Sequence, residues 1–132
     1  MTVSLVTGAG SGIDAATAAA LSARGDVVIC IDVDLASARR TAAGLSPAEA
    51  VALDLRDEAG WATVAAGVTA RHGRLDVAVA CTGIQVTAPA HELALDDFER
   101  VLGVNLTGVF LTCRAAARVM MAGGWPGASH IP

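Results

Sequence analysis

Short apolar runs and amphipathic segments alternate along the chain, and this alternation predicts a parallel α/β fold. The predicted strands cover residues 3–7, 26–32, 50–54 and 75–81. The segments between them carry apolar residues at helical spacing, over about 13–24, 35–45 and 58–71, and a longer helical region covers about 95–121. Repeated strand–helix–strand units form parallel sheets with right-handed crossovers. We therefore expect a parallel sheet with helices packed on it.

The first predicted strand ends in a glycine-rich turn that leads directly into a helical pattern. Without a Cβ, Gly8 and Gly12 can adopt positive φ and let the backbone approach a ligand. A helix that opens near Ile13 directs its free N–H groups and positive dipole end towards an anion. Many tight strand–helix turns contain two glycines and bind nothing, so the context matters. Asp32 ends the next apolar run, about twenty positions further on, where a dinucleotide site needs a carboxylate.

The long helical region carries two apolar stripes, the first formed by Leu95, Phe98 and Leu102. The second consists of Leu106, Val109, Phe110, Cys113 and Ala117. Gly103 and Gly108 bracket Asn105 and are expected to loosen the helix locally. Beyond it, residues 123–132 show no helical or strand period and contain three glycines and two prolines. The expected organisation is one domain over 1–122 and an irregular tail over 123–132.

Composition removes several classes of function. The 132 residues carry a net charge of −4 without a basic cluster, which argues against a nucleic-acid partner. No basic segment precedes an apolar stretch at the N-terminus, and the uncharged run from Val101 to Cys113 is too short to span a bilayer. The three cysteines and three histidines are scattered, without metal-ligand or disulfide spacing. We expect a soluble, cytoplasmic protein with buried free thiols and no metal.

Four motifs, taken in chain order, resemble those of the short-chain dehydrogenase/reductase family, and the likeness runs from Val3 to about Met121. Thr7 to Ile13 is similar to the family's T-G-x-x-x-G-I-G turn. The other three are Leu53-Asp54-Leu55, the lead-in to the fourth strand at 73–77, and the stretch 97–110 around Asn105. The resemblance implies a Rossmann-like, doubly wound parallel sheet that binds NAD or NADP at the carboxyl ends of its strands.

The resemblance also implies roles for individual residues. The turn at Gly8 and the backbone of Ser11, Gly12 and Ile13 would face the pyrophosphate. Asp32 would bind the adenosine ribose; its carboxylate repels a 2′-phosphate and Val33 offers no arginine, so NAD is expected over NADP. The rest of the cofactor would be framed by Asp54 and Leu55 at the adenine and by Cys81, Thr82 and Gly83 below the nicotinamide ribose. For Asp54, a helix cap or turn residue is the alternative interpretation.

The chain departs from the family pattern at two places in the predicted cofactor site. Asp14 stands where the family has its third glycine. A carboxylate roughly 5 Å from a phosphate charge costs about 3 kcal/mol at an effective dielectric near 20, or about a hundredfold in affinity. This holds if the side chain points at the phosphates; if it points away, Asp14 only favours the helix N-terminus. The family's Asn-Asn-Ala-Gly is reduced to Ala80-Cys81-Thr82-Gly83. Weak NAD binding is expected.

The chemistry that the resemblance implies has no tyrosine or lysine to perform it in these 132 residues. In the family a tyrosine exchanges the proton with the substrate oxygen, and a lysine lowers the pKa of that tyrosine. Asn105 matches the family's helix-borne catalytic asparagine, in a supporting role only, and a local break of the helix is the expected role here. The sequence therefore indicates the N-terminal cofactor-binding half of an NAD(P)-dependent oxidoreductase, truncated after the fourth strand and the following long helices and inactive alone.

Two other interpretations stay open at this stage. The chain is alternatively a non-catalytic dinucleotide-binding or interaction module, or it pairs with a separate chain that supplies the remaining half. In the family the long helices also form a dimer interface, so the 95–121 region is the expected surface for a homo-oligomer. A small-molecule cofactor is the expected ligand, with neither nucleic acid nor membrane as partner.

Overall fold

The computed structural model describes residues 1–124, and its centre is a four-stranded parallel sheet. The strands are β1 (Val3–Thr7), β2 (Val27–Asp32), β3 (Ala48–Ala52) and β4 (Val77–Val79), in the order β3-β2-β1-β4. In the register of the sheet Val3 lies opposite Val27, and Ser4 lies opposite Val77. The strand order reverses between β1 and β4, which is the switch point where α/β sheets open a crevice. The predicted parallel sheet is confirmed.

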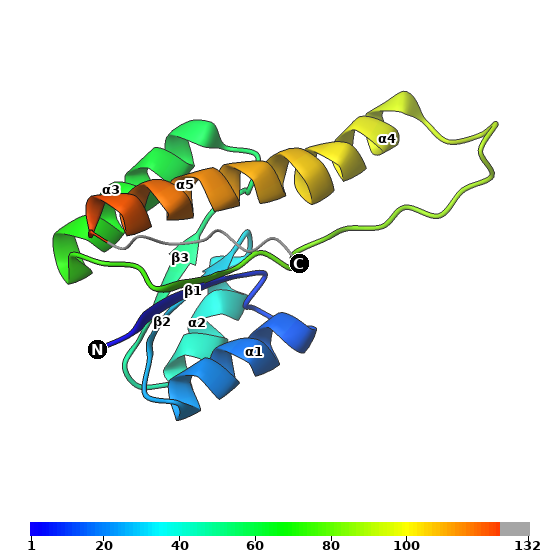
Figure 1. The fold of residues 1–132 in the computed structure, drawn as a ribbon. Helices are drawn as coiled ribbons and strands as arrows, with labels where there is room; N and C mark the ends of the chain where they lie inside the picture. Colours follow the sequence, from blue (N-terminus) through cyan, green and yellow to red (C-terminus); the bar gives the residue numbers. More distant parts are fainter. Residues whose placement is uncertain (125–132) are drawn as a thin grey trace.

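Helices cover both faces of the sheet (Figure 1). α1 (Gly12–Ala23) and α2 (Leu35–Ala43) lie on one face, and α3 (Glu58–His72) and α5 (Val109–Ala122) lie on the other. α4 (Leu95–Leu102) and the π-helical segment η1 (Gly103–Gly108) continue the line of α5 beyond the sheet. The layered arrangement is the doubly wound Rossmann-like fold that the family resemblance implied. None of the helices in residues 1–124 has both the length and the apolar composition needed to cross a membrane.

Alternating strand residues build two separate cores. Because successive side chains point to opposite faces, Leu5 and Ile29 pack under α3 and α5. Trp61 from α3 and Leu111 from α5 complete this larger core. Val6, Val28 and Cys30 point the other way, onto small residues of α1 and α2 such as Ala18 and Ala38. Alanines on this side let the two helices lie close to the sheet.

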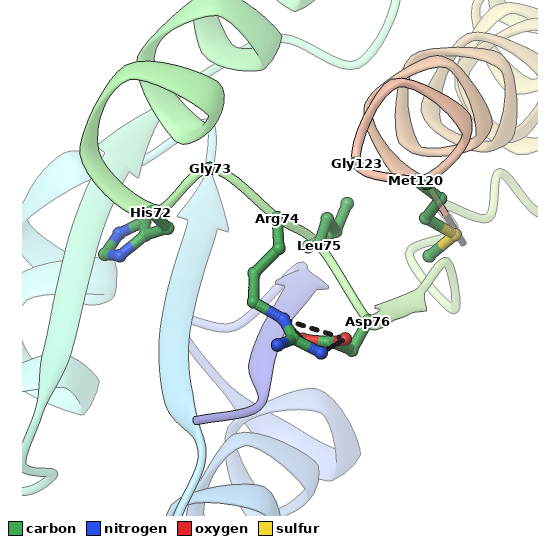
Figure 2. A pocket seen from close by; sticks show the side chains of 8 residues that line it. His72, Gly73, Arg74, Leu75, Asp76, Met120 and Gly123 are labelled. Carbon is green, nitrogen blue, oxygen red and sulfur yellow. Dashed lines mark hydrogen bonds and ion pairs between the residues drawn. The ribbon is translucent and has the colours of Figure 1, made fainter.

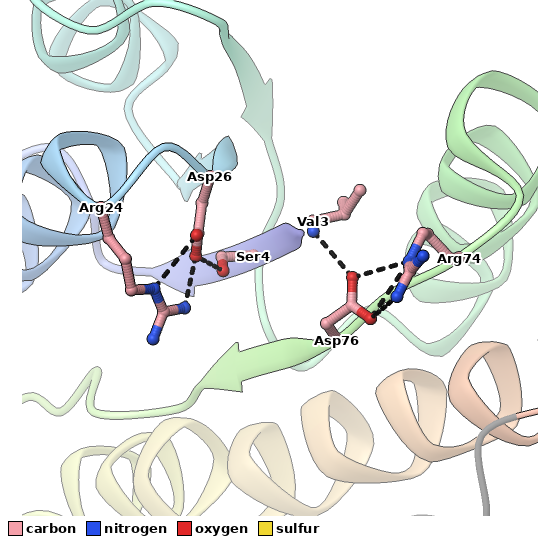
Figure 3. A network of polar contacts seen from close by, with 6 residues as sticks. All are labelled: Val3, Ser4, Arg24, Asp26, Arg74 and Asp76. Carbon is pink, nitrogen blue, oxygen red and sulfur yellow. Dashed lines mark hydrogen bonds and ion pairs between the residues drawn. The ribbon is translucent and has the colours of Figure 1, made fainter. Parts of the chain in front are cut away.

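Two carboxylates, the buried Asp26 and the half-buried Asp76, hold the amino ends of the strands (Figure 3). Asp26, only 2% exposed, accepts hydrogen bonds from Ser4 Oγ at 2.5 Å and from Arg24 Nη2 at 2.5 Å. Asp76 accepts a hydrogen bond from the backbone N–H of Val3 at 2.8 Å and also pairs with Arg74. These contacts tie β1 to the segments that lead into β2 and β4.

The structure corrects the boundaries of two predicted strands. β3 covers 48–52 rather than 50–54, and β4 covers 77–79 rather than 75–81. Leu53 and Leu55 follow the end of β3 and are buried, and Leu75 precedes β4 and is also buried. All three side chains fill the core from loops, and for this reason Leu53 and Leu75 looked like strand residues.

The predicted loosening of the long helix is confirmed, but its buried face differs from the predicted one. Residues 103–108 form a π-helix, and the face of α5 that packs on the core consists of Leu111, Thr112, Ala116 and Val119. Leu106 is 65% exposed and Phe110 is 56% exposed. Apart from Leu106, the predicted stripe and the buried face both lie in α5, which carries apolar residues on several sides, so helical spacing alone did not identify the buried side.

Two smaller predictions have mixed outcomes. Of the three cysteines, Cys30 is buried as predicted, whereas Cys81 is exposed and Cys113 is partly buried. Cys81 follows the apolar run of β4, but it lies beyond the end of that strand. Of the predicted tail, Gly123 and Gly124 form a turn, and the remaining positions, 125–132, lie outside the described residues.

Candidate functional site

Several segments singled out in the sequence meet at the carboxyl end of the sheet. The glycine turn follows β1, Asp32 ends β2, and Asp54 and Leu55 follow β3. A pocket of about 180 Å³ opens among these segments and the loop after β4. It is lined by Gly8, Asp32, Val33, Leu53, Asp54, Leu55, Arg56, Thr82, Ile84, Arg100 and Val104. Five of the predicted site residues thus border one hollow: Gly8, Asp32, Asp54, Leu55 and Thr82.

The glycine turn has the geometry that a phosphate site needs. Gly8 has φ 66° and Gly12 has φ 61°, both in the left-handed region that favours glycine. A Cβ built on Gly12 meets no atom of residues 1–124 within 4 Å, so this part of the turn borders open space. Ser11 is the N-cap of α1, and its side chain makes no capping hydrogen bond to described residues. The first-turn N–H groups around Gly12 and the 83% exposed Ile13 are therefore free for an anion.

Backbone N–H groups fix the carboxylate of Asp32 beside this turn. Its Oδ2 accepts a hydrogen bond from the N–H of Gly10 at 2.9 Å, and its Oδ1 accepts one from Asp34 at 3.0 Å. A Cβ on Gly10 would lie 2.7 Å from Asp32 Oδ2 and 2.5 Å from Ser37 Cβ, so only glycine fits there. The requirement for glycine at position 10 was not predicted, although the place of Gly10 between Gly8 and Gly12 was a visible signal.

Asp54 acts as a turn residue and also lines the pocket. Its Oδ1 accepts the backbone N–H of Arg56 at 3.0 Å, and its Oδ2 pairs with Arg56 Nη2 at 2.7 Å. The guanidinium of Arg56 holds the pKa of Asp54 below its ordinary value. Arg56 and Arg100, which also line the pocket, were missed; the signal for Arg56 was its place two residues after Asp54.

Asp14 points into the protein, towards the glycine turn. Its Oδ2 lies 2.7 Å from the position of a Cβ on Gly8, and its Oδ1 is buried without a hydrogen-bond partner among residues 1–124. Burial raises the pKa of Asp14, and the negative charge of Asp32 raises it further. The side chain of Asp14 therefore adds an uncompensated negative charge next to the turn when it is ionised.

The loop after β4 is fastened by Asn105, whose amide forms a two-point contact with the backbone of Ile84. Asn105 Oδ1 accepts the N–H of Ile84 at 2.8 Å, and its Nδ2 donates to the carbonyl oxygen of Ile84 at 2.9 Å. A break in the helix and a supporting role were expected at Asn105, whereas this contact across 21 positions was not predicted. Within the same loop Cys81 and Gly83 are exposed and lie outside the pocket lining, whereas the Thr82 side chain turns towards Gly8.

A second hollow lies at the opposite end of the sheet (Figure 2). Its volume is about 290 Å³, and it lies between the segment His72–Asp76 and the end of α5 near Met120 and Gly123. Its polar side chains are already paired: Arg74 with Asp76, and the His72 ring with Glu49 at 2.6 Å. Four of its lining residues belong to the motif at 73–77, but none of the predicted cofactor-site residues lines it. No cluster of three or more His, Cys, Asp or Glu side chains suited to a metal ion occurs in residues 1–124.

Comparisons with known proteins agree with this geometry. The family model for short chain dehydrogenases matches residues 2–127. D-threitol dehydrogenase of Mycolicibacterium smegmatis is 38% identical over 126 residues, which cover 92% of this chain and 48% of that protein. The chain spans about half the length of the curated relatives it matches.

Two similar solved structures are complexes with a nicotinamide cofactor. A metagenomic short-chain oxidoreductase in complex with NADP has a TM-score of 0.85 and 35% identity, covering 94% of this chain and 58% of that one. The 3-ketoacyl-(acyl-carrier-protein) reductase from Brucella melitensis complexed with NADH has a TM-score of 0.81 and 34% identity, covering 86% and 47%. Together with the glycine turn and Asp32, these matches show that the chain belongs to the short-chain dehydrogenase family.

Proposed function

We propose that this chain provides the NAD-binding part of a short-chain oxidoreductase that exchanges hydride with a hydroxyl or carbonyl substrate. The observation that carries the proposal is the convergence of the open glycine turn, the fixed carboxylate of Asp32 and the Asp54–Leu55 wall on one pocket. Membership of the family supports the reaction class. The bound nicotinamide would supply the hydride chemistry, and the residues described here would hold the cofactor.

The proposed binding roles follow the order of the cofactor. The N–H groups of Ser11, Gly12 and Ile13 would bind the pyrophosphate, with Gly8 giving the turn its shape. Asp32 would accept hydrogen bonds from the adenosine ribose hydroxyls. The adenine would lie against Asp54 and Leu55, and the nicotinamide ribose would lie against Cys81, Thr82 and Gly83.

The proposed preference for NAD over NADP depends on charge. The carboxylate of Asp32 would repel a 2′-phosphate, and Val33 provides no positive charge next to it. Arg56, which lines the same pocket, is already paired with Asp54 at 2.7 Å and is not free to receive a phosphate. Because the related structures contain NADP in one case and NADH in the other, the preference rests on these residues alone.

We further propose that these 132 residues alone bind the dinucleotide without turnover. The family's route needs a tyrosine and a lysine, and this sequence contains neither. Asn105 would have a supporting role, since its side chain holds the loop after β4.

A second candidate function is a non-catalytic interaction module. The apolar residues Leu95, Phe98, Leu102, Leu106 and Phe110 are each 42–67% exposed along α4, η1 and α5. A contiguous exposed apolar surface marks a protein–protein interface. We propose that it joins two copies of this chain, which is compatible with dinucleotide binding.

Calorimetric titration with NAD and with NADP tests the proposed cofactor site. We expect NAD to bind more tightly than NADP, and Asp32→Asn to reduce this preference because the repelling charge is gone. Glu92→Gln removes an exposed carboxylate outside the pocket and serves as the matched control. Absence of binding at millimolar NAD, in the parent and in Asp14→Gly, would contradict the proposal.

A further inference from the structure

Two unpartnered polar groups meet against the glycine turn. Asp14 Oδ2 lies 2.7 Å, and Thr82 Oγ1 2.6 Å, from the same point, the position of a Cβ on Gly8. Asp14 belongs to the first turn of α1, and Thr82 belongs to the loop after β4. Asp14 Oδ1 and Thr82 Oγ1 are both buried and have no hydrogen-bond partner among residues 1–124. The gap between α1 and this loop is therefore filled by a carboxyl and a hydroxyl that leave hydrogen-bonding capacity unused.

The surroundings of Asp14 contain no compensating cation. From the end of β2, Asp32 faces it with a like charge. From the loop after β4, the uncharged Thr82 hydroxyl faces it, and the neighbouring Cys81 is exposed. Within residues 1–124 Asp14 takes part in no ion pair, and only the positive end of its own helix favours its charge. Burial and Asp32 both raise the pKa of Asp14, in agreement with this placement.

A dinucleotide would add negative charge at the same place. Its pyrophosphate would bind the N–H groups of residues 11–13, which directly precede Asp14 in the chain. Ionised Asp14 and the phosphates would repel each other across a partly buried space, where screening by water is weak. A neutral carboxyl removes this repulsion and can exchange a hydrogen bond with Thr82, whose hydroxyl is both donor and acceptor.

We propose that dinucleotide binding requires Asp14 in its neutral form, so that one proton passes from solvent to the Asp14 carboxylate when the cofactor binds. The proposal rests on the proposed function, because it concerns the same cofactor site. The protonation state of Asp14 then determines whether the site binds the dinucleotide. Binding and protonation are linked reciprocally, so the bound cofactor also makes the proton harder to remove.

The sign of the pH dependence follows from this linkage. Above the pKa of Asp14 in the free protein, the carboxylate must gain a proton before the cofactor binds, and the affinity falls as the pH rises. The fall is at most about tenfold per pH unit, because one proton is involved.

Calorimetric titration with NAD between pH 5 and 8, in two buffers of different ionisation enthalpy, tests the proposal. For the parent we expect affinity to rise towards pH 5 and up to one proton to be taken up per NAD bound. For Asp14→Asn, which is uncharged throughout, we expect no proton uptake and no gain of affinity towards pH 5. Glu92→Gln, with an exposed carboxylate neutralised, should behave as the parent does.

The outcomes separate the two proposals. If the parent and Asp14→Asn bind NAD with the same pH dependence and without proton uptake, the role of Asp14 is overturned and the cofactor site stands. If neither binds NAD at any pH, the cofactor site itself is overturned. Carbon-13 NMR of the Asp14 carboxyl in the parent needs no variant. We expect its titration to move to higher pH on addition of NAD, and an unchanged titration in the presence of bound NAD would overturn the proposal.

Discussion

Asp26 and Asp14 show how partners decide the charge state of a carboxyl in this fold. Asp26 is 2% exposed, yet the Arg24 side chain holds its pKa below the ordinary value, and Ser4 adds a hydrogen bond that lowers it further. Asp14 is less buried, but its buried oxygen has no partner among residues 1–124 and its pKa is raised. Burial acts to raise the pKa of both carboxyls; the hydrogen bonds from Arg24 and Ser4 reverse the direction at Asp26, whereas the buried oxygen of Asp14 has no donor among residues 1–124.

Asp26→Asn should lower the free energy of unfolding by about 1–3 kcal/mol at pH 7, because an amide cannot replace the charge-assisted hydrogen bonds to Arg24 and Ser4. The folded-state pKa of Asp26 lies below its unfolded value of about 3.9. Its contribution is therefore complete above pH ~4 and is lost as the pH falls through the folded-state pKa. Urea unfolding at pH 7 and pH 3 measures this difference.

The control for Asp26→Asn is Asp97→Asn, which removes a carboxylate from an exposed pair with Arg100 and should cost less than about 1 kcal/mol. A loss at Asp26 no larger than the loss at Asp97 would contradict the proposed role of the buried network. An effect of Asp26→Asn that stays constant down to pH 3 would contradict the lowered pKa.

At the scale of elements, the π-helical segment η1 positions two parts of the candidate site. Asn105, near its middle, holds the loop after β4 through Ile84. Gly108, at its end, packs on Leu55, a lining residue of the pocket. A regular α-helix would turn these residues to other faces. The wider turn of the π-helix thus allows η1 to contact both the pocket wall and the loop after β4 where it continues α4.

Two glycine-to-alanine substitutions in helices should have opposite effects. A Cβ on Gly108 would lie 2.9 Å from Leu55 Cβ, which is fixed by the chain, so Gly108→Ala should destabilise the fold by about 1–3 kcal/mol. A Cβ on Gly67 in α3 would lie 2.9 Å from Nη1 of Arg71, the end of a flexible side chain. Gly67→Ala should therefore stabilise the fold by up to about 1 kcal/mol through helix propensity. Thermal and urea unfolding measure the change in the free energy of unfolding for each substitution. If both substitutions changed it in the same direction, this packing would be contradicted.

Much of the fold could be predicted because it depends on local patterns. The four apolar runs and the glycine turn before α1 define strand–helix units, and parallel strands necessarily bring Gly8, Asp32 and Asp54 to one edge. The approach of Thr82 to Gly8, and the contact of Asn105 with Ile84, could not be predicted. They join segments far apart in the chain, and they depend on how the loop after β4 returns over the turn. Leu53 and Leu75 misled the strand assignment because core-filling loop residues look like strand residues.

At the scale of the whole molecule, one surface of the long helix has no cover among residues 1–124. α5 buries Leu111, Ala116 and Val119 against the sheet, whereas Leu106 in η1 and Phe110 in α5 are more than half exposed. Arg114 lies over the Phe110 ring, with its guanidinium carbon 5.1 Å from the ring centre. This contact shields one ring only, so the apolar row from Leu95 to Phe110 stays available for a second copy.

Leu106→Glu should therefore weaken self-association, because it places a charge in the middle of this row. We expect the parent to show concentration-dependent dimers in sedimentation velocity. Leu106→Glu should raise the dimer dissociation constant at least about tenfold, because burying an unpaired charge costs more than 1.4 kcal/mol.

The control is Ala62→Glu, which adds the same charge to an exposed position of α3 and should leave the dimer unchanged. A parent that stays monomeric at all concentrations, or a dimer insensitive to Leu106→Glu, would show that the row is not the interface. Because Leu106 lies outside the pocket lining, NAD binding should survive the loss of the dimer, which separates assembly from cofactor binding.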